Sequence, residues 1–148
     1  MLFRSIDPAA AFAEAEGDPA GVAHRLSDRL FELAGGRRLR TVVITGIHCR
    51  GGIATVTRDL SCCDDVSVFI QPRVGRDYPG TGDIFASVLL GGLLSGATAA
   101  QAAEDASRFS ALCAERTASL CPDEPVRDGV ALEPLLGMLA TGRFRDEK

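Results

Sequence analysis

The sequence lacks the features that mark several common classes of protein. Its purely apolar runs are far shorter than the ~20 residues that a membrane-spanning helix needs. The first residues do not have the layout of a secretory signal peptide. Acidic residues (20) outnumber basic ones (16), and the basic residues form no long stripe that would bind nucleic acid. We therefore expect a cytoplasmic protein that binds neither membranes nor nucleic acid.

The sequence also lacks the patterns of a disulfide framework, a zinc site, a P-loop and a nucleophile elbow. The five cysteines are odd in number and show no Cys-x-x-Cys spacing, which argues against a disulfide framework and a zinc site. The adjacent Cys62 and Cys63 are expected to be reduced in a hairpin turn. No Gly-x-x-x-x-Gly-Lys is present, which excludes a P-loop, and no Gly-x-Ser-x-Gly elbow is present. A chain of 148 residues is long enough for one domain with a sizeable core.

The first regular element is expected after an irregular stretch over residues 1–19. Asp18 followed by Pro19 is typical of a helix N-cap with proline at the first helical position. Apolar residues then recur at helical spacing, and two glycines at 35 and 36 end the pattern. The residues expected on the inner face are Val22, Leu26, Leu30 and Leu33.

Three extended segments follow this helix. Residues 39–45 are rich in β-branched side chains with a continuous apolar centre, which predicts a buried, parallel-type strand ended by Gly46. Residues 53–58 and 66–70 are expected to form a β-hairpin or meander. Because ligands lie at the carboxyl ends of strands in open α/β sheets, we expect Thr45 at the edge of a binding site. His48 is expected in a loop, without a role.

The stretch Gly80-Thr81-Gly82-Asp83 precedes an apolar helix and is the strongest functional signal. With Thr81 as N-cap, the free N–H groups of the glycine-rich turn and the positive helix end would form an anion site. Asp83 would fall at the second helical position, where its carboxylate could face the anion. Such a pair suits phosphoryl transfer to a hydroxyl group. The alternative is a purely structural helix start, to which Asp83 contributes about 0.3–1 kcal/mol.

Helices are expected in the rest of the chain. The helix over residues 81–94 is apolar almost all round, which predicts burial on several sides, and Gly91 and Gly92 indicate close packing against a sheet. Thr98 is expected to cap a second helix, and a last helix is expected over residues 131–140. Residues 143–148 are expected to fray. The inner face of the second helix should hold Ala102, Ala103, Ala106, Phe109, Ser110 and Cys113.

The strand Val42–Gly46, the hairpin, the following loop and the segment Gly80–Ser87 together resemble the C-terminal half of the ribokinase-like small-molecule kinases. The likeness is greatest to the bacterial pyridoxal/pyridoxamine (vitamin B6) kinases and covers about residues 39–120. It implies an α/β fold, namely the C-terminal portion of a three-layer α/β/α domain over residues 20–142. That portion would contain a β-hairpin and a buried helix after the Gly-Thr-Gly-Asp motif.

The resemblance also implies roles for the motif residues. Asp83 matches the catalytic base that deprotonates the acceptor hydroxymethyl group, and it would therefore contact the substrate. The backbone amides of Gly80, Thr81 and Gly82 match the anion hole for the transferred phosphoryl group. Thr81 and Gly82 also match nucleotide contacts.

Further contacts follow from the same resemblance. Thr45 matches a residue near the ATP phosphates, and the loop from Gln71 to Val74 matches the segment beside the adenine, with Val74 as an apolar contact. The implied cofactors are ATP and Mg²⁺, and the implied reaction is phosphorylation of a vitamin B6 vitamer. No protein ligand to a metal is assigned. The full-length family implies a homodimer.

The chain differs from this family in length. Family members are considerably longer, and their N-terminal half supplies the acceptor pocket, so we interpret the chain as a truncated form of such a kinase. Residues 1–6 do not resemble the family. Alone, the chain is expected to bind ATP weakly and not to phosphorylate vitamin B6. Two alternatives stay open: a hydroxymethylpyrimidine or sugar kinase, and a non-catalytic nucleotide-binding fragment.

Overall fold

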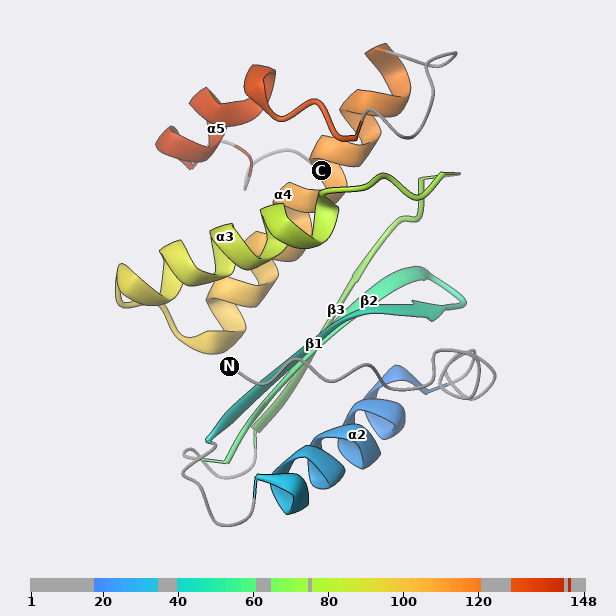
Figure 1. Cartoon of the computed structure of the whole chain (residues 1–148), viewed down its shortest axis with the longest axis vertical. Coiled ribbons are helices and arrows are strands. Elements are labelled where there is room, and N and C mark those ends of the chain that lie inside the picture. The colour runs from blue at the N-terminus through green and yellow to red at the C-terminus, as the bar shows by residue number, and fades with distance from the viewer. Residues whose placement is uncertain are drawn as a thin grey trace. The chain divides into compact units, whose positions relative to one another are not determined.

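The computed structural model describes residues 18–34, 40–60, 65–74, 76–120, 129–142 and 144. The chain divides into two compact units, Met1–Ile70 and Gln71–Lys148. Among the described residues, the first unit contains helix α2 and a sheet, and the second contains helices (Figure 1). The expectations for residues 1–17 and for Cys62 and Cys63 lie outside the described residues.

Helix α2 spans Pro19–Leu33, and its predicted start is confirmed. The Asp18 carboxylate caps it by accepting a hydrogen bond from the Gly21 N–H at 2.9 Å, with Pro19 at the first helical position. The expected inner face is only partly right. Val22 is buried, but Leu33 is exposed, and the buried set is Val22, Ala23 and Ser27.

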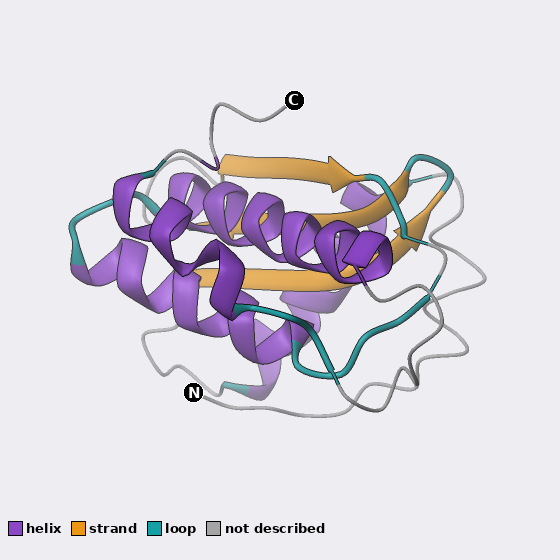
Figure 2. Cartoon of the chain, turned by 90° about the horizontal axis from the view of Figure 1, so that it is seen from above, coloured by secondary structure: helices purple, strands orange, loops and turns teal. Residues whose placement is uncertain are grey.

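The sheet of the first unit has the order β1-β2-β3, with β1 at Thr41–Cys49, β2 at Gly52–Asp59 and β3 at Asp65–Gln71. Figure 2 shows the strands in orange. Strands β1 and β2 are antiparallel and are joined by a two-residue turn, with Cys49 opposite Gly52. The predicted hairpin or meander over the second and third strands is confirmed.

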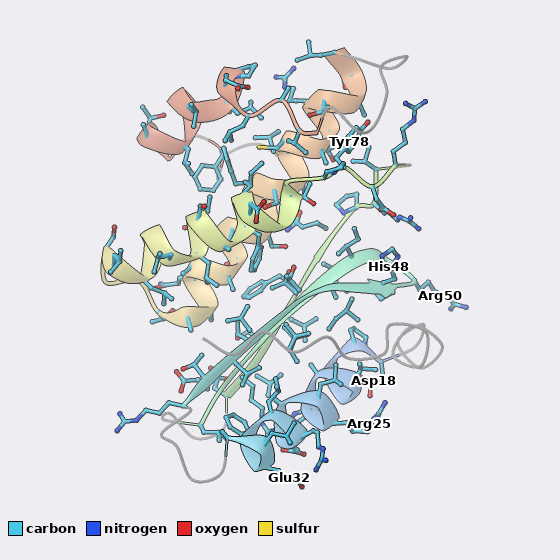
Figure 3. All side chains as sticks on the ribbon, in the orientation of Figure 1. Asp18, Arg25, Glu32, His48, Arg50 and Tyr78 are labelled. Carbon is cyan, nitrogen blue, oxygen red and sulfur yellow. The ribbon has the colours of Figure 1, made fainter. Side chains whose placement is uncertain are left out.

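Two expectations for β1 are wrong. In the described sheet β1 pairs with β2 alone, in antiparallel fashion, so the parallel-type pairing is not observed. Gly46 does not end the strand, which continues to Cys49. His48 therefore lies in the strand, opposite Ile53, and not in a loop (Figure 3). A run of β-branched residues fits either pairing, so the sequence could not distinguish them.

The core of the first unit lies between α2 and one face of the sheet. It contains Val22, Ala23, Ile47, Ala54 and Val56. Residues 54, 56 and 58 share that face because side chains alternate along a strand. This places Arg58 against α2.

The Arg58 side chain is only 11% exposed. It donates to the Ser27 hydroxyl at 2.8 Å and to the Asp28 carboxylate, and its guanidinium lies 5.6 Å from the centre of the Phe31 ring. Burying a guanidinium costs free energy unless it is hydrogen-bonded, and these bonds offset that cost. Arg58 thus links β2 to α2.

The second unit is built on α3 at Thr81–Leu94 and α4 at Ala99–Leu120, which pack against each other (Figure 1). Thr98 caps α4 as predicted. Its hydroxyl accepts from the Gln101 N–H at 3.2 Å, and the Gln101 side chain accepts from the Thr98 N–H at 3.1 Å, which is a capping box. The predicted inner face of α4 is confirmed for Ala102, Ala103, Ala106, Phe109 and Cys113, all of which are fully buried.

The surroundings of α3 differ from the expectation. A Cβ atom at Gly92 would lie 2.9 Å from the Cβ of Ala102, so this glycine allows close approach of α4 and not of a sheet. Ile84 and Phe85 are buried, but Leu90 and Leu94 are 56% and 80% exposed. The helix is therefore not buried on several sides in its C-terminal half. No helix of the described segments is long and apolar enough to cross a membrane.

The C-terminal part of the chain also departs from the expectation. The last helix begins later than predicted, as a 3-10 turn η2 at Glu133–Leu135 followed by α5 at Leu136–Thr141. Phe144 was expected to fray, but it is 2% exposed. Its ring packs edge-to-face on Phe109 with ring centres 5.3 Å apart. Burial of an aromatic ring outweighs the tendency of a chain end to fray.

Candidate active site

The Gly-Thr-Gly-Asp motif forms the start of α3, one residue out of register with the expectation. Gly80 is the N-cap, since its carbonyl accepts the first helical hydrogen bond from the Ile84 N–H at 3.0 Å. Its φ of +93° is a left-handed conformation that favours glycine. Thr81 is therefore the first helical residue and Asp83 the third.

The Thr81 hydroxyl closes the turn and does not cap the helix. It donates a hydrogen bond to the Tyr78 carbonyl at 3.1 Å. Tyr78 is buried and lies in the segment that leads into α3 (Figure 3). No side chain of the described residues caps the helix start. The turn is thus fixed from its N-terminal side, while the first-turn amides stay available.

The amides at this helix start are unused, and the space beside them is open. Among the described residues, none accepts a hydrogen bond from the N–H groups of Gly80, Thr81 or Gly82. A Cβ atom at Gly82 would meet nothing within 4 Å. Alanine would therefore fit at this helical position and would favour the helix. Glycine here is not required by packing, and it leaves room for an anion at the positive end of the helix.

The Asp83 carboxylate is exposed in the first turn of α3. Within the described parts of the chain it makes no hydrogen bond or ion pair. At the third helical position a carboxylate commonly bonds back to the N-cap amide, as in a capping box. Asp83 and Gly80 do not form that bond. The carboxylate can therefore accept a proton from a hydroxyl group brought to the helix start.

Thr45 lies in a β-bulge of the first unit. The pairing of β1 with β2 shifts between Ile44 and Ile47, so that Thr45 and Gly46 together oppose Thr55. The hydroxyls of Thr45 and Thr55 are 3.1 Å apart and share a hydrogen bond. Bulges commonly redirect a side chain beside a functional site. The role of Thr45 near the ATP phosphates stays a prediction.

The predicted adenine segment leads from β3 toward the motif. Gln71 is the last residue of β3, and Val74 lies in the loop that follows; both are half-buried. In the same loop, Arg73 forms an exposed ion pair with Asp77 at 3.3 Å. An exposed pair of this kind contributes little to stability. The nucleotide contacts assigned to Gln71 and Val74 stay predictions.

Gly129, which the sequence analysis did not single out, also lies near the turn. A Cβ atom at Gly129 would lie 3.3 Å from the carbonyl oxygen of Pro79, the residue before the N-cap. The only sequence signal was a glycine ahead of the last helical segment. Its contact with the motif depends on how the chain returns after α4, which no local pattern reveals.

The comparisons with known proteins define the class of fold. No family model matches the sequence. Several solved structures match, and they place the chain in the ribokinase-like kinase fold, as a C-terminal portion of it. The resemblance inferred from the motif and the strand is confirmed at this level.

Three of the matching structures come from two small-molecule kinases. One is a protein from Bacteroides thetaiotaomicron provisionally named as a phosphomethylpyrimidine kinase, with 25% identity and a TM-score of 0.67 over 80% of this chain and 40% of that one. A second crystal form of that protein, with pyridoxal, matches with 24% identity and a TM-score of 0.62. This match covers 80% of this chain and 41% of that one. The other is a pyridoxal kinase from Lactobacillus plantarum, with 24% identity and a TM-score of 0.64. This match covers 76% of this chain and 39% of that one. The chain spans about 40% of the length of these proteins.

Proposed function

We propose that this chain supplies the phosphoryl-transfer part of a ribokinase-like kinase that acts on the hydroxymethyl group of a vitamin B6 vitamer. The observation that carries the proposal is the start of α3. There no described residue accepts a hydrogen bond from the amides of Gly80, Thr81 and Gly82, open space lies beside Gly82, and an exposed carboxylate stands in the same turn. The two kinds of matching kinase support the reaction class.

In this proposal the amides hold the transferred phosphoryl group. Amide N–H groups fixed at a helix end stabilise developing negative charge without reorganisation, and one such donor is typically worth about 10²–10³ in rate. The left-handed Gly80 sets the direction in which the first amide points. Gly82 keeps the approach open.

Asp83 accepts the proton of the acceptor hydroxyl. Its carboxylate is exposed and unpaired among the described residues, so it can approach the hydroxyl without first breaking a bond. General-base assistance of this kind contributes typically about 10²–10⁴ in rate.

ATP with Mg²⁺ supplies the phosphoryl group when bound. Around the described residues, no three His, Cys, Asp or Glu side chains gather to hold a metal ion. We propose that phosphate oxygens and water hold most of the Mg²⁺, which is common for this ion. Thr45, Gln71 and Val74 remain the proposed nucleotide contacts.

The acceptor is proposed from the names of the matching proteins. One matching structure is a pyridoxal kinase, and the other protein was crystallised with pyridoxal. The name of the Bacteroides protein, a phosphomethylpyrimidine kinase, favours a hydroxymethylpyrimidine acceptor as the alternative. A non-catalytic nucleotide-binding role would need only the amides and not Asp83. Loss of Asp83 therefore separates the two kinase functions from the non-catalytic role, and the choice of acceptor separates the two kinases.

The test uses the native gene product, whose mass is measured first. Its ATP-dependent phosphorylation of pyridoxal and of hydroxymethylpyrimidine is then compared for the wild type and Asp83→Asn. The proposal expects kcat to fall about 10²–10⁴-fold while the affinity for Mg·ATP changes about twofold or less. Glu133→Gln removes a charge from an exposed carboxylate in the same unit and should change neither quantity.

The outcome also decides between the alternatives. Unchanged turnover in Asp83→Asn would remove Asp83 from the mechanism. Mg·ATP binding without transfer to either acceptor would favour the non-catalytic role. For the 148-residue chain on its own, we expect weak binding of Mg·ATP and no formation of pyridoxal phosphate. Robust product formation by that chain would show that it contains the acceptor pocket.

A further inference from the structure

The segment that follows α4 returns to the catalytic turn through Gly129. A Cβ atom there would lie 3.3 Å from the Pro79 carbonyl oxygen, and the φ of Gly129 is +82°. Both the space and the backbone conformation therefore favour glycine. The contact point is the peptide that joins Pro79 to the N-cap, Gly80.

That peptide carries one of the proposed anion donors. The Pro79 carbonyl and the Gly80 N–H belong to one planar peptide unit and point in opposite directions. Whatever contacts the carbonyl therefore influences the direction of the N–H. No described residue accepts a hydrogen bond from this N–H, so a ligand could use it. Gly129 is thus placed to hold the donor in its orientation.

The returning segment is itself anchored to α4 by Thr117. The buried Thr117 hydroxyl donates to the Cys113 carbonyl at 2.7 Å and accepts from the Ala131 N–H at 3.0 Å. This second bond fixes the chain two residues after Gly129. A hydroxyl with one donor and one acceptor partner, both on backbone, is a directional support.

The same segment shares a hydrophobic cluster with α3. Val130 and Leu132 pack against the core cluster that contains Ile84, and Ile84 directly follows Asp83. The start of α3 therefore has the Gly129 backbone close beside the peptide ahead of its N-cap, and a hydrophobic cluster around Ile84 in its first turn. Both supports come from residues 129–132, and Thr117 fixes these residues.

We propose that Thr117 and Gly129 are positioning residues for the anion-binding turn at the start of α3. They contact neither phosphate nor acceptor, and they set the direction of the Gly80 amide through the Pro79 peptide. The inference rests on the proposed function only for its consequence, which is weaker binding of a phosphate-bearing ligand. The coupling between the two segments is a property of the ligand-free chain.

The first experiment compares the amide resonances of Gly80 and Gly82 by NMR, in the full 148-residue chain without ligand. Gly129→Ala should shift both resonances clearly. Gly137→Ala is the matched control, because its new Cβ meets nothing within 4 Å. If Gly129→Ala leaves both resonances as little changed as the control does, the proposal is wrong.

The second experiment tests the Thr117 anchor and covers the case in which Gly129→Ala fails to fold. Thr117→Val keeps the shape but loses the acceptor for Ala131, whereas Thr117→Ser keeps the hydroxyl. The valine variant should shift the Gly80 amide, and the serine variant should restore it. Thr141→Val removes an exposed hydroxyl bonded within α5 and is the control. Equal spectra for the valine and serine variants would overturn the anchoring role.

Titration with Mg·ATP, well below the unfolding temperature, adds the functional readout. Losing one well-aligned amide donor to a charged group should weaken binding about tenfold in Gly129→Ala and Thr117→Val. Shifted resonances with unchanged affinity would contradict the positioning role. Absence of binding in the wild type would instead contradict the proposed function, and the ligand-free spectra would still decide whether the coupling exists.

Discussion

Replacing Gly82 by alanine should strengthen the fold and weaken the site. The position is helical and its would-be Cβ meets nothing within 4 Å, so no clash opposes the substitution. Alanine exceeds glycine in helix propensity by about 0.5–1 kcal/mol, and a first-turn position should give the lower part of that range. The methyl group would, however, fill the space that we assign to the anion. Stability and affinity should therefore move in opposite directions.

The matched control is Gly91→Ala in the same helix. Gly91 also has open space around its would-be Cβ, so alanine should raise the free energy of unfolding by up to about 1 kcal/mol. It lies far along α3 from the helix start, and Mg·ATP affinity should not change. Urea unfolding gives the stability, and NMR titration with Mg·ATP gives the affinity. We expect Gly82→Ala to weaken binding at least about tenfold.

Two results would refute this reasoning. Gly82→Ala with wild-type affinity would mean that the open space beside the amides is not used by the phosphate. An equal loss of affinity in Gly91→Ala would mean that the effect comes from the helix as a whole. Gly92→Ala checks the steric argument, because its Cβ would lie 2.9 Å from the Ala102 Cβ. It should destabilise the chain by about 1–3 kcal/mol, in contrast to its neighbour.

Three further predictions concern stability. Arg58→Met should lower the free energy of unfolding, measured in urea, by about 1–3 kcal/mol, because the buried Ser27 hydroxyl loses the hydrogen bond that it accepts from Arg58. Arg29→Met is the control. It removes only an exposed ion pair and should change the free energy of unfolding by less than about 0.5 kcal/mol. Burial raises the pKa of the Cys113 thiol from 9.0 to about 11. The stability that the neutral buried thiol contributes is therefore fully present below pH 9 and is lost as the pH rises to 11. Unfolding free energy should fall over that window by about 2–3 kcal/mol more in the wild type than in Cys113→Ala, and parallel pH curves would exclude the effect. Phe144→Ala should cost about 3–5 kcal/mol by thermal or urea unfolding, and a neutral result would mean that this chain end frays after all.

Features that depend on neighbouring residues in the sequence were predicted well. The Asp18-Pro19 start of α2 and the Thr98 cap of α4 require only local hydrogen bonds, and both are observed. The inner face of α4 follows from helical periodicity alone, and Phe109 is fully buried as predicted. The motif at the start of α3 was found for the same reason, since a glycine-rich turn ahead of an apolar helix is a local pattern.

Features that depend on distant segments were predicted poorly. The glycine pair in α3 indicated close packing, but only the structure shows that the partner of Gly92 is Ala102 of the next helix. The burial of Phe144 likewise depends on Phe109, which lies far away in sequence. The N-cap of α3 was misplaced because Gly80 and Thr81 are both favourable cap residues. The left-handed backbone at Gly80 decides between them, and that conformation is a property of the folded turn.

The shift of one residue strengthens the case for a catalytic carboxylate. With Gly80 as N-cap, Asp83 occupies the position from which an acidic or amide side chain would ordinarily bond back to the N-cap amide. Among the described residues both groups are unpaired, although a capping hydrogen bond typically stabilises a helix start by about 0.5–2 kcal/mol. An acceptor carboxylate and a donor amide that stay apart in one exposed turn are each available to a ligand. A phosphoryl group on the amide and a hydroxyl on the carboxylate are the two reactants of a kinase, and the helix end favours the negative charge of the phosphate.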